Sequence, residues 1–133
     1  MTIDKYWEII DSLRGTGFNE KLDDLHCKLR NFEERHLVFF DKISDVNLRQ
    51  LFVARVPLAA ECLFPGEVSD SLITDLSSNI ILAGKSLFKN TITNLDSLAK
   101  SCDKLNLSNE TENHLFGIGE FILEEKNGEA NSE

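Results

Sequence analysis

One adjacent pair of residues has the types needed for nucleophilic chemistry, His26 and Cys27 in the segment LHCKL. A Cys–His catalytic pair needs its two side chains to converge within hydrogen-bond reach. Neighbouring residues of a helix point about 100° apart and do not face each other. His36 or His114 could supply a base from elsewhere, but no spacing requires it. We therefore interpret Cys27 as a half-buried thiol.

A second pair has the types needed to hold a metal ion. Glu110 and His114 lie four residues apart in ETENH, so in a helix they share a face and could supply two zinc ligands. The same spacing is common in any charged helix. The segment GIG, Gly117 to Gly119, lacks the third glycine and the preceding strand of a phosphate loop, and a close helix crossing explains it better. We expect no metal, no cofactor, no catalytic residue and no enzyme activity.

Charge gives a stronger indication of the kind of partner. The chain has 14 basic and 23 acidic side chains and a net charge of −9, of which −2 falls in residues 1–66 and −7 in residues 67–133. This charge argues against nucleic acid and against an anionic membrane surface, and it permits a basic protein partner. Simple solubility is the alternative explanation. If a partner docks on the second half, the candidate binding residues are Glu67, Asp70, Asp75, Glu110 and Glu112.

The other charged and sulfur-containing residues indicate an ordinary surface. We expect the basic residues, which are dispersed among acids, to form surface ion pairs. Three widely spaced cysteines without a CxxC motif indicate reduced, mostly buried thiols in a cytoplasmic protein. The sequence shows no signal peptide and no membrane span. The dispersed basic residues are Lys28, Arg30, Arg35, Arg49 and Arg55. The three cysteines are Cys27, Cys62 and Cys102.

The periodicity of the first half predicts four helices. The first, residues 3–13, has Thr2 as its cap and places Tyr6 and Trp7 at the edge of a core, with their polar atoms reaching water or backbone. Asn19 would cap the second helix, and Asn31 with Glu34 would form a capping box for the third. One long helix through Ile43 is the alternative. The fourth covers residues 46–63, is kinked or split at Pro57, and has the apolar residues Leu48, Leu51, Phe52, Val56, Ala59, Ala60 and Leu63.

The second half continues the helical pattern. FPGE, residues 64–67, ends the fourth helix, and Ser69 caps a fifth. Gly84 joins two helices or allows close packing, TNLDSLAKSC predicts a short helix, and the last helix covers residues 110–125. We therefore predict an all-α, single-domain bundle of six to eight helices over residues 1–126, followed by a polar tail, residues 127–133.

Four segments together resemble a family of small bacterial all-helical proteins of uncharacterised function, which opens with the pattern aromatic-Trp-x-x-Ile-Asp. They are YWEIIDSLRG, NFEERHLVFFDKI, SDSLITDLSSNIILAGKSLFKNTITNLDSLAK and GEFILEEKNGE, within residues 3–129. The chain departs from the family at Asn79-Ile80-Ile81, where an Arg-x-Trp segment is usual, and at Phe64-Pro65-Gly66. The resemblance implies an all-α fold without an established activity, and it favours packing as the role of Trp7.

By general character the chain also resembles the immunity proteins of polymorphic toxin systems, including contact-dependent growth inhibition. Their toxins are often basic nucleases, which a small acidic protein covers. This resemblance gives no residue correspondence. It implies a cytoplasmic protein that binds and neutralises a cognate toxin. The alternative is a non-enzymatic regulatory or adaptor module that binds another protein.

Overall fold

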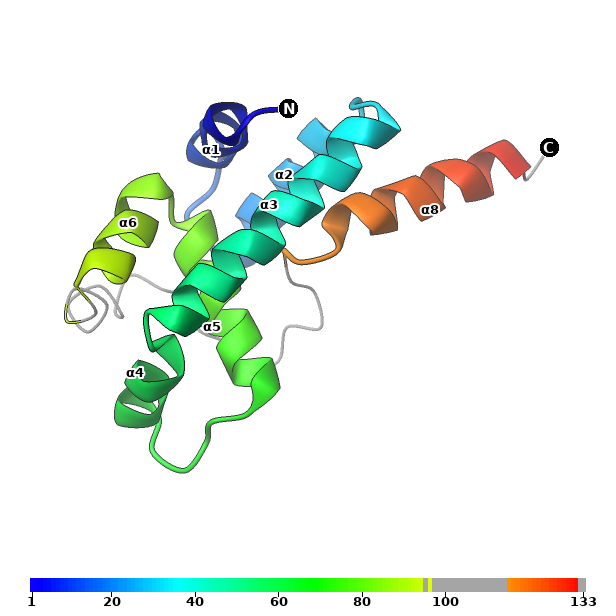
Figure 1. Cartoon of the computed structure of the whole chain (residues 1–133). Helices are drawn as coiled ribbons and strands as arrows, with labels where there is room; N and C mark the ends of the chain where they lie inside the picture. Colours follow the sequence, from blue (N-terminus) through cyan, green and yellow to red (C-terminus); the bar gives the residue numbers. More distant parts are fainter. Residues whose placement is uncertain (95, 97–114, 132–133) are drawn as a thin grey trace.

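The described part of the chain consists of helices. The computed structural model describes residues 1–94, 96 and 115–131 (Figure 1). These residues form seven helices and no strand, which confirms the predicted all-α class. The expected short helix near residue 100 lies outside them, and so does Glu110. The last helix, expected over residues 110–125, does not include residues 115–117, which form a turn, and it begins at Ile118. The helices are α1 (Ile3–Asp11), α2 (Phe18–Leu29), α3 (Glu34–Val53), α4 (Val56–Leu63), α5 (Asp70–Leu82), α6 (Lys85–Thr93) and α8 (Ile118–Asn131).

Helix α3 is the longest helix and the centre of the arrangement. It crosses the front of the molecule in Figure 1 and contacts α1, α4, α5, α6 and α8. Helix α8 packs on α2 and α3 and then extends to the right, toward the C-terminus. It continues to Asn131, so the segment expected as a polar tail begins as helix.

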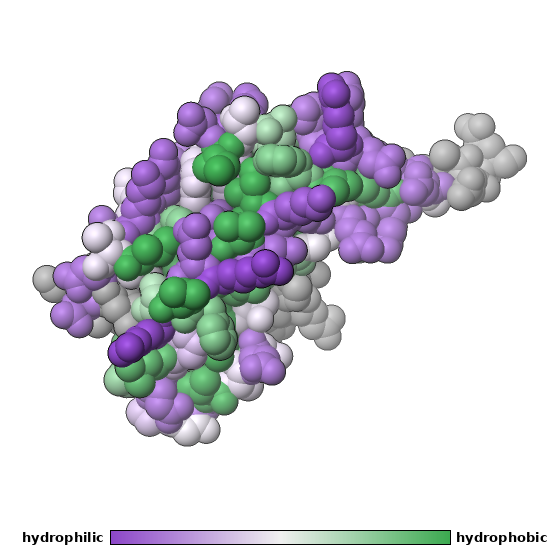
Figure 2. Space-filling view, viewed as in Figure 1, coloured by the Kyte–Doolittle hydropathy of each residue, from purple (hydrophilic) through white to green (hydrophobic). Residues whose placement is uncertain are grey.

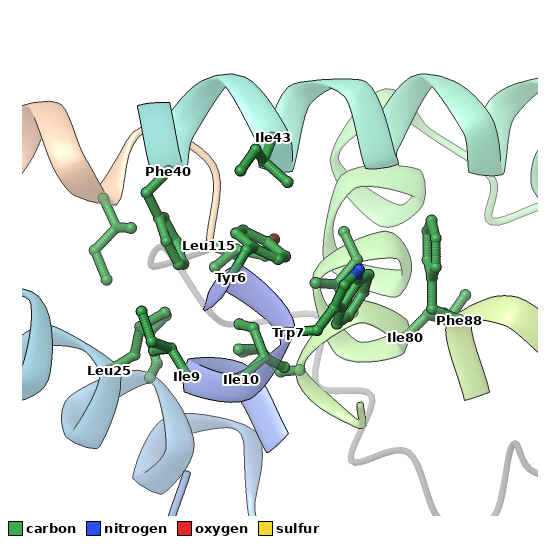
Figure 3. Close-up of a cluster of buried hydrophobic side chains, with 14 of the residues drawn as sticks. Tyr6, Trp7, Ile9, Ile10, Leu25, Phe40, Ile43, Ile80, Phe88 and Leu115 are labelled. Atoms are coloured by element: carbon green, nitrogen blue, oxygen red, sulfur yellow. The ribbon is translucent and has the colours of Figure 1, made fainter. Parts of the chain in front are cut away.

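Tyr6 and Trp7 lie in the centre of the core and not at its edge (Figure 3). The exposed fraction is 0% for Tyr6 and 4% for Trp7. The Tyr6 ring lies 4.6 Å from the Phe40 ring, and the Trp7 ring lies 5.0 Å from the Phe88 ring. The Tyr6 hydroxyl bonds the Ser44 hydroxyl at 2.8 Å, so its partner is an α3 side chain and not water or backbone. The aromatic pair therefore joins α1 to α3 and α6.

Because Tyr6 is buried, we expect the free energy of unfolding to depend on pH in the alkaline range. Tyr6 is the only tyrosine of the chain, and burial raises its pKa from 10.0 to about 12, although the hydrogen bond with Ser44 opposes that rise. The unfolded chain loses this proton near pH 10 and the native protein keeps it. Stability is therefore unaffected below pH 10 and falls by roughly 3 kcal/mol as the pH rises to 12. Urea unfolding of wild type and Tyr6→Phe should show this loss in the wild type alone.

A titration of the Tyr6 hydroxyl tests the same prediction directly. Because there is one tyrosine, tyrosinate absorbance reports Tyr6 without interference. An absorbance midpoint near pH 10 in a protein that keeps its helical circular dichroism would contradict the buried position.

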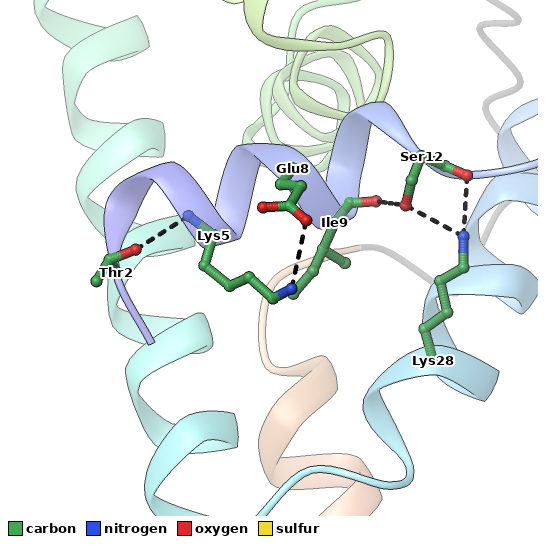
Figure 4. A network of polar contacts seen from close by, with 6 residues as sticks. All are labelled: Thr2, Lys5, Glu8, Ile9, Ser12 and Lys28. Atoms are coloured by element: carbon green, nitrogen blue, oxygen red, sulfur yellow. Dashed lines mark hydrogen bonds and ion pairs between the residues drawn. The ribbon is translucent and has the colours of Figure 1, made fainter.

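Two of the four predicted caps are confirmed. Thr2 Oγ1 accepts from Lys5 N–H at 3.1 Å (Figure 4), and Ser69 Oγ caps α5 in the same way. Asn19 and Asn31 are not caps. Helix α2 begins at Phe18, so Asn19 lies inside its first turn. Residues 30–33 separate α2 from α3, which confirms the predicted break.

A polar network ties α2 to the end of α1. Lys28 Nζ donates to the Ser12 carbonyl oxygen at 2.9 Å and to the Ser12 hydroxyl at 3.2 Å (Figure 4). The same hydroxyl donates to the Ile9 carbonyl at 2.8 Å, and Lys5 pairs with Glu8 on the exposed side. The Ser12 carbonyl, at the end of α1, thus obtains a side-chain partner from the next helix.

The break between α3 and α4 differs from the sequence prediction. The third and fourth predicted helices are one continuous helix as far as Val53, and the chain breaks at Arg55, whose φ of 67° is left-handed. Pro57 stands in the first turn of α4. A proline is tolerated there because the first-turn N–H groups have no helical partner. The helix is therefore split before Pro57 and not kinked at it.

Acids from distant helices cap α6 and α8. Asp11 accepts from Lys85 N–H at 3.0 Å, where the predicted junction at Gly84 is confirmed. Asp41 of α3 accepts from the N–H groups of Gly119 and Glu120 at 2.8 and 2.9 Å. Burial raises the pKa of the Asp41 carboxyl, and these two donors oppose the rise. The two acids bring the helix starts against α1 and α3.

Candidate protein-binding surfaces

Two of the five predicted partner-binding acids lie at the same end of the molecule. Glu67 stands in the loop between α4 and α5, Asp70 is the first residue of α5, and both are exposed. Asp75 is half-exposed and lies further along α5. Glu110 and Glu112 are outside the described residues. The structure therefore brings Glu67 and Asp70 to one end of the molecule, the lower end in Figure 1.

The exposed acids at this end form a surface that we call the acidic corner: Glu61, Glu67 and Asp70. Residues 56–84 contain four acids and no Lys, Arg or His. Glu61 of α4 accepts from Gly66 N–H at 3.3 Å, which holds the loop against the end of α4. Leu58 of α4 has an exposed fraction of 55%. The acidic corner thus joins uncompensated negative charge to an exposed apolar side chain.

A second exposed surface, which the sequence analysis missed, lies on α3. We call it the α3 outer surface, and in Figure 2 apolar and strongly polar side chains alternate along it. Phe39, Phe52 and Val53 have exposed fractions of 44%, 61% and 81%. Phe52, one of the apolar residues named for the predicted fourth helix, therefore lies on the surface. The surface consists of Arg35, Val38, Phe39, Lys42, Val46, Arg49, Phe52 and Val53, all exposed.

The spacing explains why α3 has two apolar faces. Its buried residues Leu37, Phe40, Ser44, Asn47 and Leu51 follow one another at intervals of three and four. Positions 35, 39, 42, 46, 49 and 53 repeat the same intervals on the opposite side of the helix. Dividing this stretch into two predicted helices concealed the second stripe.

The expected surface ion pairs are present for three of the five basic residues named from the sequence. Within the described ranges, Lys42, Arg49 and Arg55 have no charged partner, so basic side chains on and beside the α3 outer surface are uncompensated. The pairs observed are Lys28–Asp24 at 3.0 Å, Arg35–Glu33 at 3.0 Å and Arg30–Glu125 at 3.9 Å.

The residues first considered for chemistry are separated by the fold. His26 Nε2 bonds Glu125 of α8 at 2.5 Å, whereas Cys27 is exposed on another side of α2. Cys62 is exposed as well, so the prediction of mostly buried thiols is wrong for these two. Leu25 and Leu29 occupy the inner face of α2 and leave Cys27 outside. Among the described residues, no three His, Cys, Asp or Glu side chains converge as a metal site requires.

The fold defines the class of the protein, a single all-α domain. The chain belongs to the family described as "Protein of unknown function (DUF4240)", whose pattern matches residues 1–118. This confirms membership of an uncharacterised family, and the description names no activity. No curated protein and no solved structure matches the chain. In the described ranges, no helix combines the length and the apolarity needed to cross a bilayer.

Proposed function

We propose that this protein is a non-enzymatic immunity protein that binds a cognate bacterial toxin by direct contact and neutralises it in the cytoplasm. The acidic corner is the observation that carries this proposal. Its three exposed acids form no ion pair within the described ranges, and Leu58, one helical turn before Glu61 on α4, is exposed beside them in sequence. A basic protein surface, such as that of a nuclease, is complementary to this arrangement.

The mechanism follows from the charge and from the rigidity of the surface. The net charge of −9 accelerates encounter with a basic protein and repels nucleic acid from the complex. Acids at the rim set the orientation, and an apolar side chain at the centre supplies a contact that excludes water. Because α4 and α5 are already folded and in contact, little conformational entropy is lost on binding.

The direct test uses the protein encoded beside this one. Its C-terminal domain is expressed in bacteria with and without this protein, and growth and co-purification are recorded. Growth arrest that this protein relieves, together with a complex that co-purifies, is the expected result. Arrest that persists despite equal expression of this protein would contradict the proposal for that pair.

Charge reversal tests the placement of the interface. We expect Glu67→Lys/Asp70→Lys to weaken the complex by about a hundredfold at low salt and by less at high salt, because two steering acids become repulsive. Asp23→Lys/Glu124→Lys is the matched control, since it changes two exposed acids elsewhere by the same total charge. Calorimetric titration of both variants measures the effect. Equal weakening by both pairs would show a general charge effect and no acidic-corner interface.

A regulatory or adaptor module is the second candidate function. The α3 outer surface favours it, because this surface differs from the acidic corner in charge and lies on another helix. A protein with two exposed surfaces of opposite character can hold two different partners.

A further inference from the structure

We propose that the α3 outer surface is a docking site for an amphipathic helix of another protein, in which acidic residues alternate with apolar ones. This partner is distinct in chemistry from the basic protein proposed for the acidic corner. The proposal therefore stands or falls independently of the immunity function.

Six residues of the α3 outer surface have the spacing of two paired helices, and we call these six residues the seam. Phe39, Val46 and Val53 are seven residues apart, and so are the three basic residues Arg35, Lys42 and Arg49. Coiled-coil pairs use this repeat, with two positions of each heptad facing the partner. Here one facing position is apolar in every heptad and the other is basic. Helix α3 has 20 residues, about 30 Å, which is long enough for nearly three heptads.

The charges of the seam indicate that the partner helix carries acidic residues. Lys42 and Arg49 have no charged partner within the described ranges, although the protein as a whole has an excess of acids. The acids nearest along the helix are Asp45, beside the seam, and Asp41, which faces the start of α8. Acidic residues on a partner helix would pair with these basic groups, and its apolar residues would cover Phe39, Val46 and Val53.

The surface is already shaped and held in place. Its first half forms an open depression of about 600 Å³, lined by Glu33, Glu34, Arg35, Val38, Phe39 and Lys42. The opposite face of α3 is locked into the core through Leu37, Phe40 and Leu51, each fully buried. An incoming helix therefore meets a rigid surface with an aromatic side chain, Phe39, as a natural anchor.

A second copy of this chain does not fit the seam. In a parallel pair the basic layers Arg35, Lys42 and Arg49 would meet their own copies. In an antiparallel pair each basic group would pack against an apolar residue of the other copy without a charge partner. An anionic membrane would match the basic residues, but the net charge of −9 opposes its approach.

Two synthetic helical peptides of three heptads, bound to the full chain, test the inference. Both carry Leu at one facing position, and the other facing position is Glu in the first peptide and Lys in the second. We expect wild type to bind the Glu peptide at least about tenfold more tightly than the Lys peptide, measured by fluorescence anisotropy. The variant Lys42→Glu/Arg49→Glu should reverse this preference, and Lys85→Glu/Lys89→Glu on α6 should leave it unchanged.

Each contrary result identifies a different error. No preference between the peptides, or no reversal in Lys42→Glu/Arg49→Glu with its helical circular dichroism intact, would overturn the proposal. A wild-type dimer in light scattering that this variant abolishes would assign the surface to a second copy instead. Binding to phosphatidylserine vesicles that the variant abolishes would assign it to a membrane.

Discussion

Trp7→Ala should lower the free energy of unfolding by about 3–5 kcal/mol, the range measured when a buried aromatic side chain is truncated. Trp7 is 4% exposed, lies edge-on to the Tyr6 ring at 5.2 Å and contacts the Phe88 ring at 5.0 Å. Truncation leaves a cavity where α1 meets α6, and the rigid surroundings cannot fill it. Urea unfolding followed by circular dichroism measures the change.

The matched control is Phe52→Ala on the α3 outer surface. Phe52 is also a large aromatic residue in a helix, but it is 61% exposed. Its removal should change stability by no more than about 0.5 kcal/mol, because little of its area is lost from the core. If Trp7→Ala were as mild as Phe52→Ala, the aromatic pair of α1 would belong to a surface and its interpretation as core would be wrong.

Gly119→Ala should be the most damaging single-methyl change in the described part of the chain, with a loss of about 2–4 kcal/mol. A Cβ at Gly119 would overlap the carbonyl oxygen of Leu37 and lie 2.9 Å from both carboxylate oxygens of Asp41. The carbonyl belongs to the α3 backbone and cannot turn away. Helix α8 must therefore move off α3, which also breaks the bonds from the Gly119 and Glu120 N–H groups to Asp41.

Gly128 of the same helix provides the control. A Cβ added there meets nothing within 4 Å. Gly128→Ala should therefore leave stability unchanged or raise it by up to about 1 kcal/mol, because alanine favours the helix more than glycine does. Thermal unfolding of both variants separates the effects. Equal stability of Gly119→Ala and Gly128→Ala would show that α8 does not cross α3 as closely as the structure has it.

Local features explain which predictions of structure succeeded. The caps Thr2 and Ser69, the junction at Gly84 and the close crossing at GIG were all predicted from the sequence and are confirmed. Caps and junctions depend on a few neighbouring residues, so short windows contain the information. The predicted caps Asn19 and Asn31 failed because a residue with capping ability also occurs beside a helix start without being used.

The candidate surfaces were predictable to different degrees. The acidity of residues 67–133 is a property of composition, and it led directly to Glu67 and Asp70. The α3 outer surface required knowledge that residues 34–53 form one helix. With residues 34–53 divided between two predicted helices, the repeat of basic and apolar residues on the outer side could not be recognised.

The sequence by itself determined the all-α class, the family and the acidic balance of the chain, because periodicity, motifs and charge are properties of residues near one another. Only the tertiary structure decided which apolar stripe of α3 is buried. Both stripes have helical spacing, and burial depends on where α1, α5 and α8 pack. It also decided that Asp11 and Asp41 cap α6 and α8 through N–H groups that lie 74 and 78 residues further along the chain, since such contacts exist only after the helices have come together.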